Sequence, residues 1–192
     1  RGRPGWPRAV LDVPGLTSAS AVVELGAGTG KLTRLLVAAF ADVVAIEPDE
    51  GMRRVLALAS PGARVLAGSA ESIPLPGGAA DAVFAAEAFH NFDAAAAVAD
   101  SARVLSPGGT LVLSVPYVNG VRRLTSPWLR RQSRAVKDHG GTFYQFVFTR
   151  GELWAALARH GFHPLSSAPY DPARLLRKAL PGRIVRRLTS MR

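Results

Sequence analysis

Three glycines at alternate positions, Gly26, Gly28 and Gly30, constrain this chain more than any other feature of its sequence. They follow a short apolar run over residues 21–25, which is typical of a strand buried on both faces of a parallel sheet. After them, apolar residues recur at helical spacing over residues 32–40. The stretch therefore predicts a strand, a glycine turn and a helix. This geometry brings a ligand against bare backbone and against the unpaired N–H groups of the first helical turn.

The spacing of this loop restricts the ligand that it can hold. A phosphate-binding P-loop requires four residues before Gly-Lys-Ser/Thr, whereas only three separate Gly26 from Gly30, and Leu32 replaces the hydroxyl residue. The dinucleotide fingerprint requires a third glycine at the position of Lys31, so it fits one residue out of register. Glu24, just before the first glycine, is better placed beside an ammonium group than beside a pyrophosphate.

The sequence from Glu24 to Gly30 resembles motif I of the class I S-adenosylmethionine-dependent methyltransferases. The resemblance implies that S-adenosylmethionine is the cofactor and that the loop reaches it through Glu24, Gly26, Ala27, Gly28 and Gly30.

A second acidic residue, Glu47, lies about 20 residues after Gly26 and ends a predicted strand over residues 43–46. An acid at this spacing can accept hydrogen bonds from both ribose hydroxyls of a nucleoside. The resemblance implies this role for Glu47, with Pro48 beside it. It also implies that Met52 packs on the adenine face, although an ordinary core position explains Met52 equally well.

Two further stretches extend the resemblance along the chain. Ser69, Ala70 and Glu71 follow a predicted third strand and resemble the family's Gly-Asp-Ala-Glu, whose acid bonds the adenine amino group. Ser69 replaces that acid, so the adenine contact passes to its hydroxyl or to the backbone of Ala70. Glu87 follows a predicted strand over residues 81–86, at the carboxyl end where ligands bind in open parallel sheets.

The order of the predicted strands and helices implies an α/β fold. Their alternation over residues 21–115 predicts a Rossmann-like, doubly wound, mostly parallel sheet with helices on both faces. We predict one methyltransferase domain over residues 1–192, with an N-terminal segment, 1–20, and a substrate-side, basic C-terminal region, 116–192. A sixth strand is expected over residues 162–168. The family's seventh, antiparallel strand is not found, so the chain is expected to lack family segments at both ends.

Three helices are predicted from local signals outside the glycine loop. One runs from Asp93, its N-cap, to Leu105. Another is predicted beyond Pro127, in the basic stretch over residues 121–137. A third spans Arg150 to His160 and is followed by a glycine suited to a helix end.

The inferred reaction is transfer of a sulfonium methyl group to a nucleophile on the substrate, so the protein mainly supplies alignment and a dry pocket. A hydroxyl acceptor benefits from a general base near its proton. By position, the candidates are His90, Tyr117 and Tyr144. His90 is favoured because it follows the fourth predicted strand at the ligand edge, although most loop histidines are not catalytic. A carbon or nitrogen acceptor needs none of them.

The charge of the chain is unevenly distributed. Residues 1–121 carry 9 basic and 11 acidic side chains, whereas residues 122–192 carry 15 basic and 3 acidic ones. The basic region suits an anionic partner, or it is a solvated surface with no partner. The chain resembles the small-molecule "type 11" methyltransferases, some of which act in lipid or glycan pathways, so a small or lipid-linked, possibly anionic, acceptor is expected. No Asp/Asn-Pro-Pro motif follows the fourth strand, which argues against a nucleic-acid substrate.

Composition narrows the remaining possibilities. There are no cysteines, and the four histidines lack the spacing of a zinc motif, so no metal is predicted. No apolar run approaches the roughly 18 residues of a membrane helix and no secretory signal is visible, which predicts a cytoplasmic protein. Peripheral membrane contact through the basic tail stays open. Two alternatives also remain: a nicotinamide-dependent oxidoreductase that uses NAD, and a cofactor-binding protein without catalysis.

Overall fold

The structure is a computed structural model of the chain and describes residues 6–86, 88–115, 134–138, 141–145 and 150–167. The chain divides into two compact units, residues 1–162 and residues 163–192. All the described helices and strands belong to the first unit. Of the second unit only residues 163–167 are described, and they form no helix or strand. The single domain expected over residues 1–192 stays a prediction.

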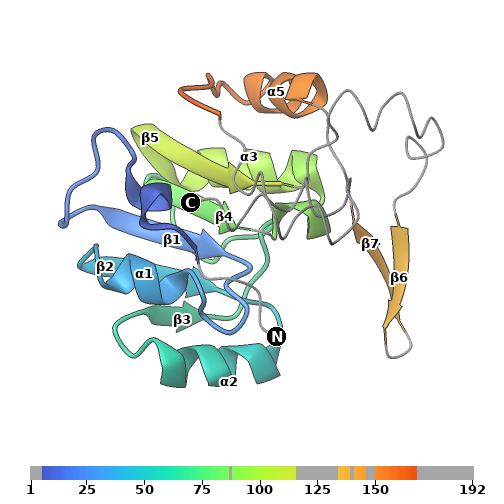
Figure 1. The fold of residues 1–192 in the computed structure, drawn as a ribbon. Helices are drawn as coiled ribbons and strands as arrows, with labels where there is room; N and C mark the ends of the chain where they lie inside the picture. The colour runs from blue at the N-terminus through green and yellow to red at the C-terminus, as the bar shows by residue number, and fades with distance from the viewer. Residues whose placement is uncertain (1–5, 87, 116–133, 139–140, 146–149, 168–192) are drawn as a thin grey trace, which may run out of the picture. The chain divides into compact units, whose positions relative to one another are not determined.

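A five-stranded sheet organises the first unit, with its strands side by side in the order β3-β2-β1-β4-β5 (Figure 1). All four pairings between neighbouring strands are parallel. The strands are β1 (Ala21–Leu25), β2 (Asp42–Ile46), β3 (Arg64–Leu66), β4 (Ala80–Ala86) and β5 (Leu105–Ser114). Parallel strands all end at one edge of a sheet, so the segments after β1, β2, β3 and β4 meet there.

Helical segments connect most of the strands, and two of the described helices begin at a capping aspartate. The helices are α1 (Thr33–Val37), α2 (Glu50–Ala59), α3 (Ala94–Val104) and α5 (Arg150–Ala158), with short 3-10 turns η1 (Arg8–Leu11) and η2 (Phe89–Asn91). Asp49 caps α2 by accepting the Met52 N–H at 2.7 Å. The predicted N-cap of α3 is confirmed, because the Asp93 carboxylate accepts the N–H groups of Ala95 and Ala96.

Alternate residues of the central strands face opposite sides of the sheet, and each side has its own core. One side, under α1, is formed by Val22, Leu32, Leu36, Val43, Ala82 and Phe84. Ala45 faces the same side and packs with Leu56 of α2. The other side, under α3 and α5, includes Val23, Val44, Val83, Val98, Leu153 and Leu157. Helices therefore cover both faces of a parallel sheet, which confirms the predicted Rossmann-like fold.

Two predictions of secondary structure are wrong. Residues 134–137, the described part of the helix expected beyond Pro127, form a strand instead: β6 (Arg134–Asp138) pairs antiparallel with β7 (Gly141–Gln145). The residues that follow explain the difference, since the pair Gly140-Gly141 favours a turn and the aromatic residues Phe143 and Tyr144 favour a strand that can pair with β6. The sixth strand expected over residues 162–168 is also absent from its described part, residues 162–167. Its apolar run contains Pro164, which cannot donate a backbone hydrogen bond.

Candidate functional site

The candidate site lies where the sheet changes its direction of winding. From β1 the chain moves outward through β2 to β3, and then crosses to β4 on the other side of β1. In open parallel sheets, ligands bind outside the carboxyl ends of the strands at such a switch point. The glycine loop that follows β1 starts at this point (Figure 1).

The glycine loop has a backbone that only glycine adopts easily. Gly26, Gly28 and Gly30 have φ angles of 63°, 58° and 82°. A Cβ at Gly26 would lie 2.7 Å from the Cβ of Ala88, in the segment after β4. At Gly28, in contrast, a Cβ would meet nothing within 4 Å. The loop is therefore packed against the protein at its first glycine and open at its second, as a backbone that receives a ligand must be.

Glu47 joins the end of β2 to the glycine loop. Its side chain is only 5% exposed, and its Oε2 accepts the N–H of Gly28 at 2.8 Å. Its Oε1 accepts the N–H of Asp49 at 3.0 Å. A carboxylate has about four lone-pair sites, so both oxygens keep acceptor capacity for ribose hydroxyls. The structure thus brings two predicted site residues, Gly28 and Glu47, into direct contact.

Glu24 is a buried carboxyl at the base of the same loop. It is 3% exposed, and its Oε2 accepts the hydroxyl of Thr33 at 2.6 Å. Burial raises its pKa from 4.5 to about 8; the Thr33 hydrogen bond opposes this increase, and the negative charge of Glu47 adds to it. A cation that enters the site favours the ionised form of Glu24. The sequence reasoning missed Thr33, whose only signal was a hydroxyl nine positions after a buried acid.

The segment after β3 carries the predicted adenine-side residues. Ala70 is buried, Ser69 is half-buried, and Ser69 forms an isolated antiparallel bridge with Ser72. Glu71 is directed elsewhere, because its Oε1 accepts the N–H of Asp93 at the start of α3 at 2.9 Å. Glu71 therefore anchors this segment to α3, and its predicted cofactor contact stays a prediction.

The segment after β2 carries the other predicted contacts. Pro48 is exposed and Met52, in the first turn of α2, is 45% exposed, so Met52 is not an ordinary core residue. Arg53, which the sequence reasoning missed, donates from Nη1 to the carbonyl oxygens of Glu47 at 2.8 Å and Pro48 at 2.5 Å. No sequence motif predicts these contacts of Arg53, because they depend on the turn after β2 that brings its side chain back to Glu47 and Pro48.

The proposed general bases are described only in part. His90 lies in η2, after the carboxyl end of β4, and the backbone of Tyr144 lies in β7. Two buried phenylalanines flank His90: the rings of Phe89 and Phe92 meet edge to face, 6.2 Å between centroids. Glu87 and Tyr117 lie outside the described residues. The catalytic roles of His90, Tyr117 and Tyr144 and the cofactor contact of Glu87 stay predictions.

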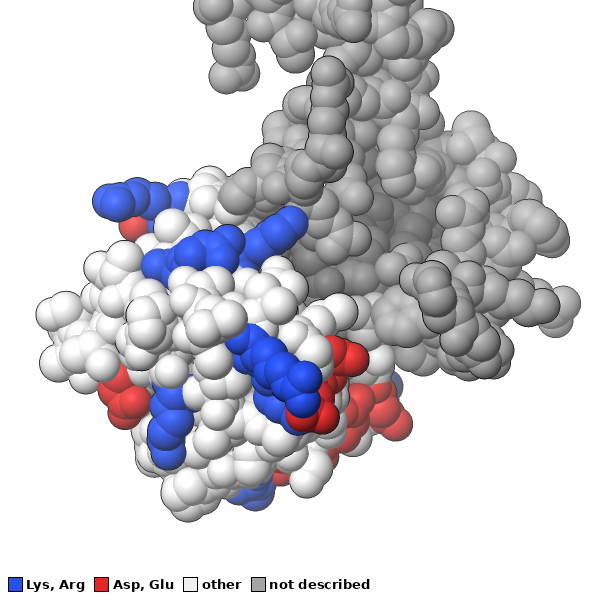
Figure 2. All heavy atoms as spheres, turned by 90° about the horizontal axis from the view of Figure 1, so that it is seen from below, with Lys and Arg blue, Asp and Glu red and all other residues white. Residues whose placement is uncertain are grey.

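The described surface beside α2 carries no concentration of basic side chains (Figure 2). Figure 2 shows wide uncharged areas between scattered basic and acidic groups, some of them in contact, on the described part of this face. The basic excess belongs to residues 122–192, most of which the structure does not describe.

Known proteins resemble this chain in both sequence and fold. A family model described as "Methyltransferase domain" matches residues 23–113, from β1 to β5. A methyltransferase of Mycobacterium tuberculosis is 48% identical over 160 residues, which cover 83% of this chain and 64% of that protein. A methyltransferase-like protein of Schizosaccharomyces pombe is 32% identical over 180 residues, covering 91% of this chain and 68% of that protein. The chain belongs to the class I S-adenosylmethionine-dependent methyltransferases.

The structural comparison supports the same fold. A crystal structure described as an S-adenosylmethionine-dependent methyltransferase from Mesorhizobium loti superposes with a TM-score of 0.62 at 22% identity. The match covers 93% of this chain and 90% of that one. The chain spans just under two thirds of the length of the mycobacterial relative. Neither the oxidoreductase nor the non-catalytic alternative is supported by these relatives.

Two kinds of feature are absent from the described residues. Within them, no three His, Cys, Asp or Glu side chains are grouped so that they could hold a metal ion. Among the described helices, none is long and apolar enough to cross a membrane.

Proposed function

We propose that this domain transfers a methyl group from S-adenosylmethionine to a small or lipid- or glycan-linked, anionic acceptor. The observation that carries the proposal is the contact of Glu47 with Gly28: a buried carboxylate accepts the N–H of a glycine whose Cα faces open space. This pairing leaves room for a ligand beside an acceptor of ribose hydroxyls.

The residues of the edge fit the parts of this cofactor. Glu47 would hold the ribose hydroxyls, and Ser69 with the Ala70 backbone would contact the adenine amino group. Met52, exposed on α2, would cover the adenine face. Glu24 would face the ammonium group, which offsets the cost of its buried charge. The other cofactor-edge positions are Gly26, Ala27, Gly30, Pro48, Glu71 and Glu87.

When bound, the cofactor supplies an electrophilic sulfonium methyl group. The residues of this chain hold the reactants in line and exclude water, which can account for much of the rate. His90, Tyr117 and Tyr144 are the candidates to accept the proton of a hydroxyl acceptor. Among them His90 is favoured because η2 follows the carboxyl end of β4.

The acceptor class rests on charge. Residues 122–192 have 15 basic and 3 acidic side chains, which suits an anionic small molecule or lipid headgroup. We expect the protein to act in the cytoplasm, with peripheral membrane contact through this basic region.

Calorimetric titration with S-adenosylhomocysteine, and with NAD in parallel, tests the cofactor. We expect micromolar binding of S-adenosylhomocysteine alone. The variant Gly28→Val places a side chain in the open space and is expected to abolish binding. Gly15→Val is a matched control, since Gly15 also has a positive φ, 85°, and open surroundings, but precedes the amino end of β1. Unchanged affinity in a folded Gly28→Val variant contradicts the site assignment, and binding of NAD alone contradicts the function.

An acceptor screen then tests the reaction, beginning with anionic lipids and sugars. Methyl transfer from labelled cofactor to one of these classes supports the proposal. Cofactor binding with no turnover across the panel favours the non-catalytic alternative instead.

A further inference from the structure

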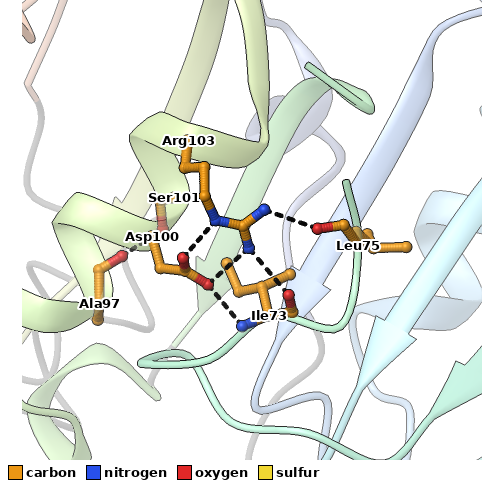
Figure 3. Close-up of polar contacts among 6 residues, drawn as sticks. All are labelled: Ile73, Leu75, Ala97, Asp100, Ser101 and Arg103. Atoms are coloured by element: carbon orange, nitrogen blue, oxygen red, sulfur yellow. Dashed lines mark hydrogen bonds and ion pairs between the residues drawn. The ribbon is translucent and has the colours of Figure 1, made fainter. Parts of the chain in front are cut away.

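A polar network outside the glycine loop ties the end of α3 to the segment between β3 and β4 (Figure 3). Arg103 donates from Nη1 to the carbonyl oxygen of Leu75 at 2.7 Å and from Nη2 to that of Ile73 at 2.9 Å. Asp100 accepts the N–H of Ile73 at 2.6 Å, so both backbone groups of Ile73 are held. Two side chains of one helix therefore fix a segment nearly 30 residues away in the sequence.

The two side chains also orient one another. Arg103 donates from Nε to Asp100 Oδ1 at 2.6 Å and from Nη2 to Asp100 Oδ2 at 3.0 Å. This two-point contact holds the planar guanidinium in one orientation, with its remaining donors directed at the backbone. A lysine at position 103 could not make the same set of bonds.

A second set of contacts carries this restraint to the adenine-side residues. Pro74 lies between Ile73 and Leu75, the two residues held by Arg103. Gly68 packs so tightly against Pro74 that a Cβ at Gly68 would lie 2.7 Å from the Pro74 Cδ. Gly68 directly precedes Ser69 and Ala70, so the restraint ends at the residues proposed to contact adenine.

The exposure of the network argues that its role is positional. The side chains of Arg103 and Asp100 are 42% and 18% exposed. Ion pairs at such exposure stabilise a fold only weakly. Three hydrogen bonds on one short segment, made by two side chains that also bond each other, therefore matter more for where that segment lies than for the stability of the fold.

We infer that Arg103, oriented by Asp100, is a positioning residue that holds the segment over residues 68–75 against the adenine ring of the cofactor. Arg103 does not touch the cofactor itself. It acts through Ile73, Leu75 and the contact between Pro74 and Gly68. The inference rests on the proposed function, and it assigns selectivity for the adenine amino group to this network.

The test compares two ligands by calorimetry on the full chain: S-adenosylhomocysteine and S-inosylhomocysteine, in which a carbonyl oxygen replaces the adenine amino group. The wild-type chain is expected to prefer the adenosyl compound about tenfold, the value of one well-placed hydrogen bond. Arg103→Met is expected to reduce this preference to about twofold or less. Its affinity for the inosyl compound should stay close to that of the wild type.

Matched variants separate positioning from loss of structure. Arg54→Met removes an equally charged side chain from an exposed pair with Glu50 on α2, and should keep the preference. Arg103→Lys retains a donor and should recover part of the preference. Asp100→Asn, a milder change, should reduce it even if Arg103→Met does not fold. Amide hydrogen exchange over residues 68–75 should be faster in Arg103→Met without any ligand.

The outcomes are distinct for the two proposals. If the wild-type chain binds neither compound, the proposed function is wrong and the inference with it. If the wild-type chain binds both equally, or if the Arg103 and Asp100 variants keep the wild-type preference, only the inference is overturned.

Discussion

Two loops at the same edge of the sheet are held in different ways. The glycine loop, residues 26–30, follows β1 and has three positive φ angles, a tight contact of Gly26 with Ala88, and a buried carboxylate bonded to Gly28. The loop after β3, residues 68–79, is held by an exposed arginine and its aspartate on α3.

The two loops show two ways in which a protein fixes the conformation of a loop. The glycine loop depends on close packing and backbone conformation, so a single added methyl group is costly there. The loop after β3 also packs closely at Gly68, but it is joined to α3 by polar contacts near water, which fix its position and contribute little to stability. The following predictions test this contrast.

The largest effect is expected for Gly26→Val. The positive φ of 63° and the 2.7 Å approach to Ala88 together should lower the free energy of unfolding by about 4 kcal/mol. Urea denaturation measures it. Gly15→Val, with a positive φ but no neighbour, should cost only about 1–2 kcal/mol. Equal costs for the two variants contradict the packing argument.

The second prediction concerns the pH dependence of stability. The pKa of Glu24 is raised from 4.5 to about 8, so the folded state keeps a proton that the unfolded state releases. Stability should therefore fall as pH rises from 5 to 8, with a contribution of about 3 kcal/mol from this group. Glu24→Gln cannot ionise and should lack this decrease. If the stability of the wild-type chain and that of Glu24→Gln change in parallel between pH 5 and pH 8, the prediction is wrong.

The third prediction is weaker cofactor binding in Glu47→Ala. Loss of hydrogen bonds to a charged group should lower the affinity for S-adenosylhomocysteine by about 1.5 to 3 kcal/mol, measured by calorimetry. Replacing Glu50, an exposed acid on α2, by alanine is the control and should leave the affinity unchanged. Wild-type affinity in a folded Glu47→Ala variant would show that Glu47 does not contact the cofactor.

The smallest effect is expected for Asp100→Asn on α3, which changes a contact that holds the loop after β3. Its hydrogen bond with Arg103 lowers the pKa of Asp100 below the ordinary 3.8, so its stabilisation is present above that pH and is lost as pH falls below it. We expect Asp100→Asn to lower the free energy of unfolding by about 0.5 to 1 kcal/mol at pH 7 and by less at pH 3, as measured by urea denaturation. A loss in free energy of unfolding as large as that of Gly26→Val would contradict the proposed difference between the two loops.

Local signals in the sequence were sufficient for much of the fold. Buried strands, helix periodicity and the cap at Asp93 all depend on residues within a few positions of each other, and the structure has them. Local signals were insufficient for residues 134–137, where the spacing of apolar residues predicts a helix but the aromatic residues that favour a partner strand come later, in β7. The pairing of β6 with β7 decided in favour of the strand.

By itself, the sequence determined that a glycine loop follows a buried strand, with an acid before it and another at the end of the next strand. These features need only composition and spacing. The tertiary structure decided which groups meet: Glu47 with Gly28, Thr33 with Glu24, and Arg103 with the segment after β3. Burial shifts the pKa of Glu24, and burial is a property of the packed sheet. Such contacts join distant positions, and no local pattern records them.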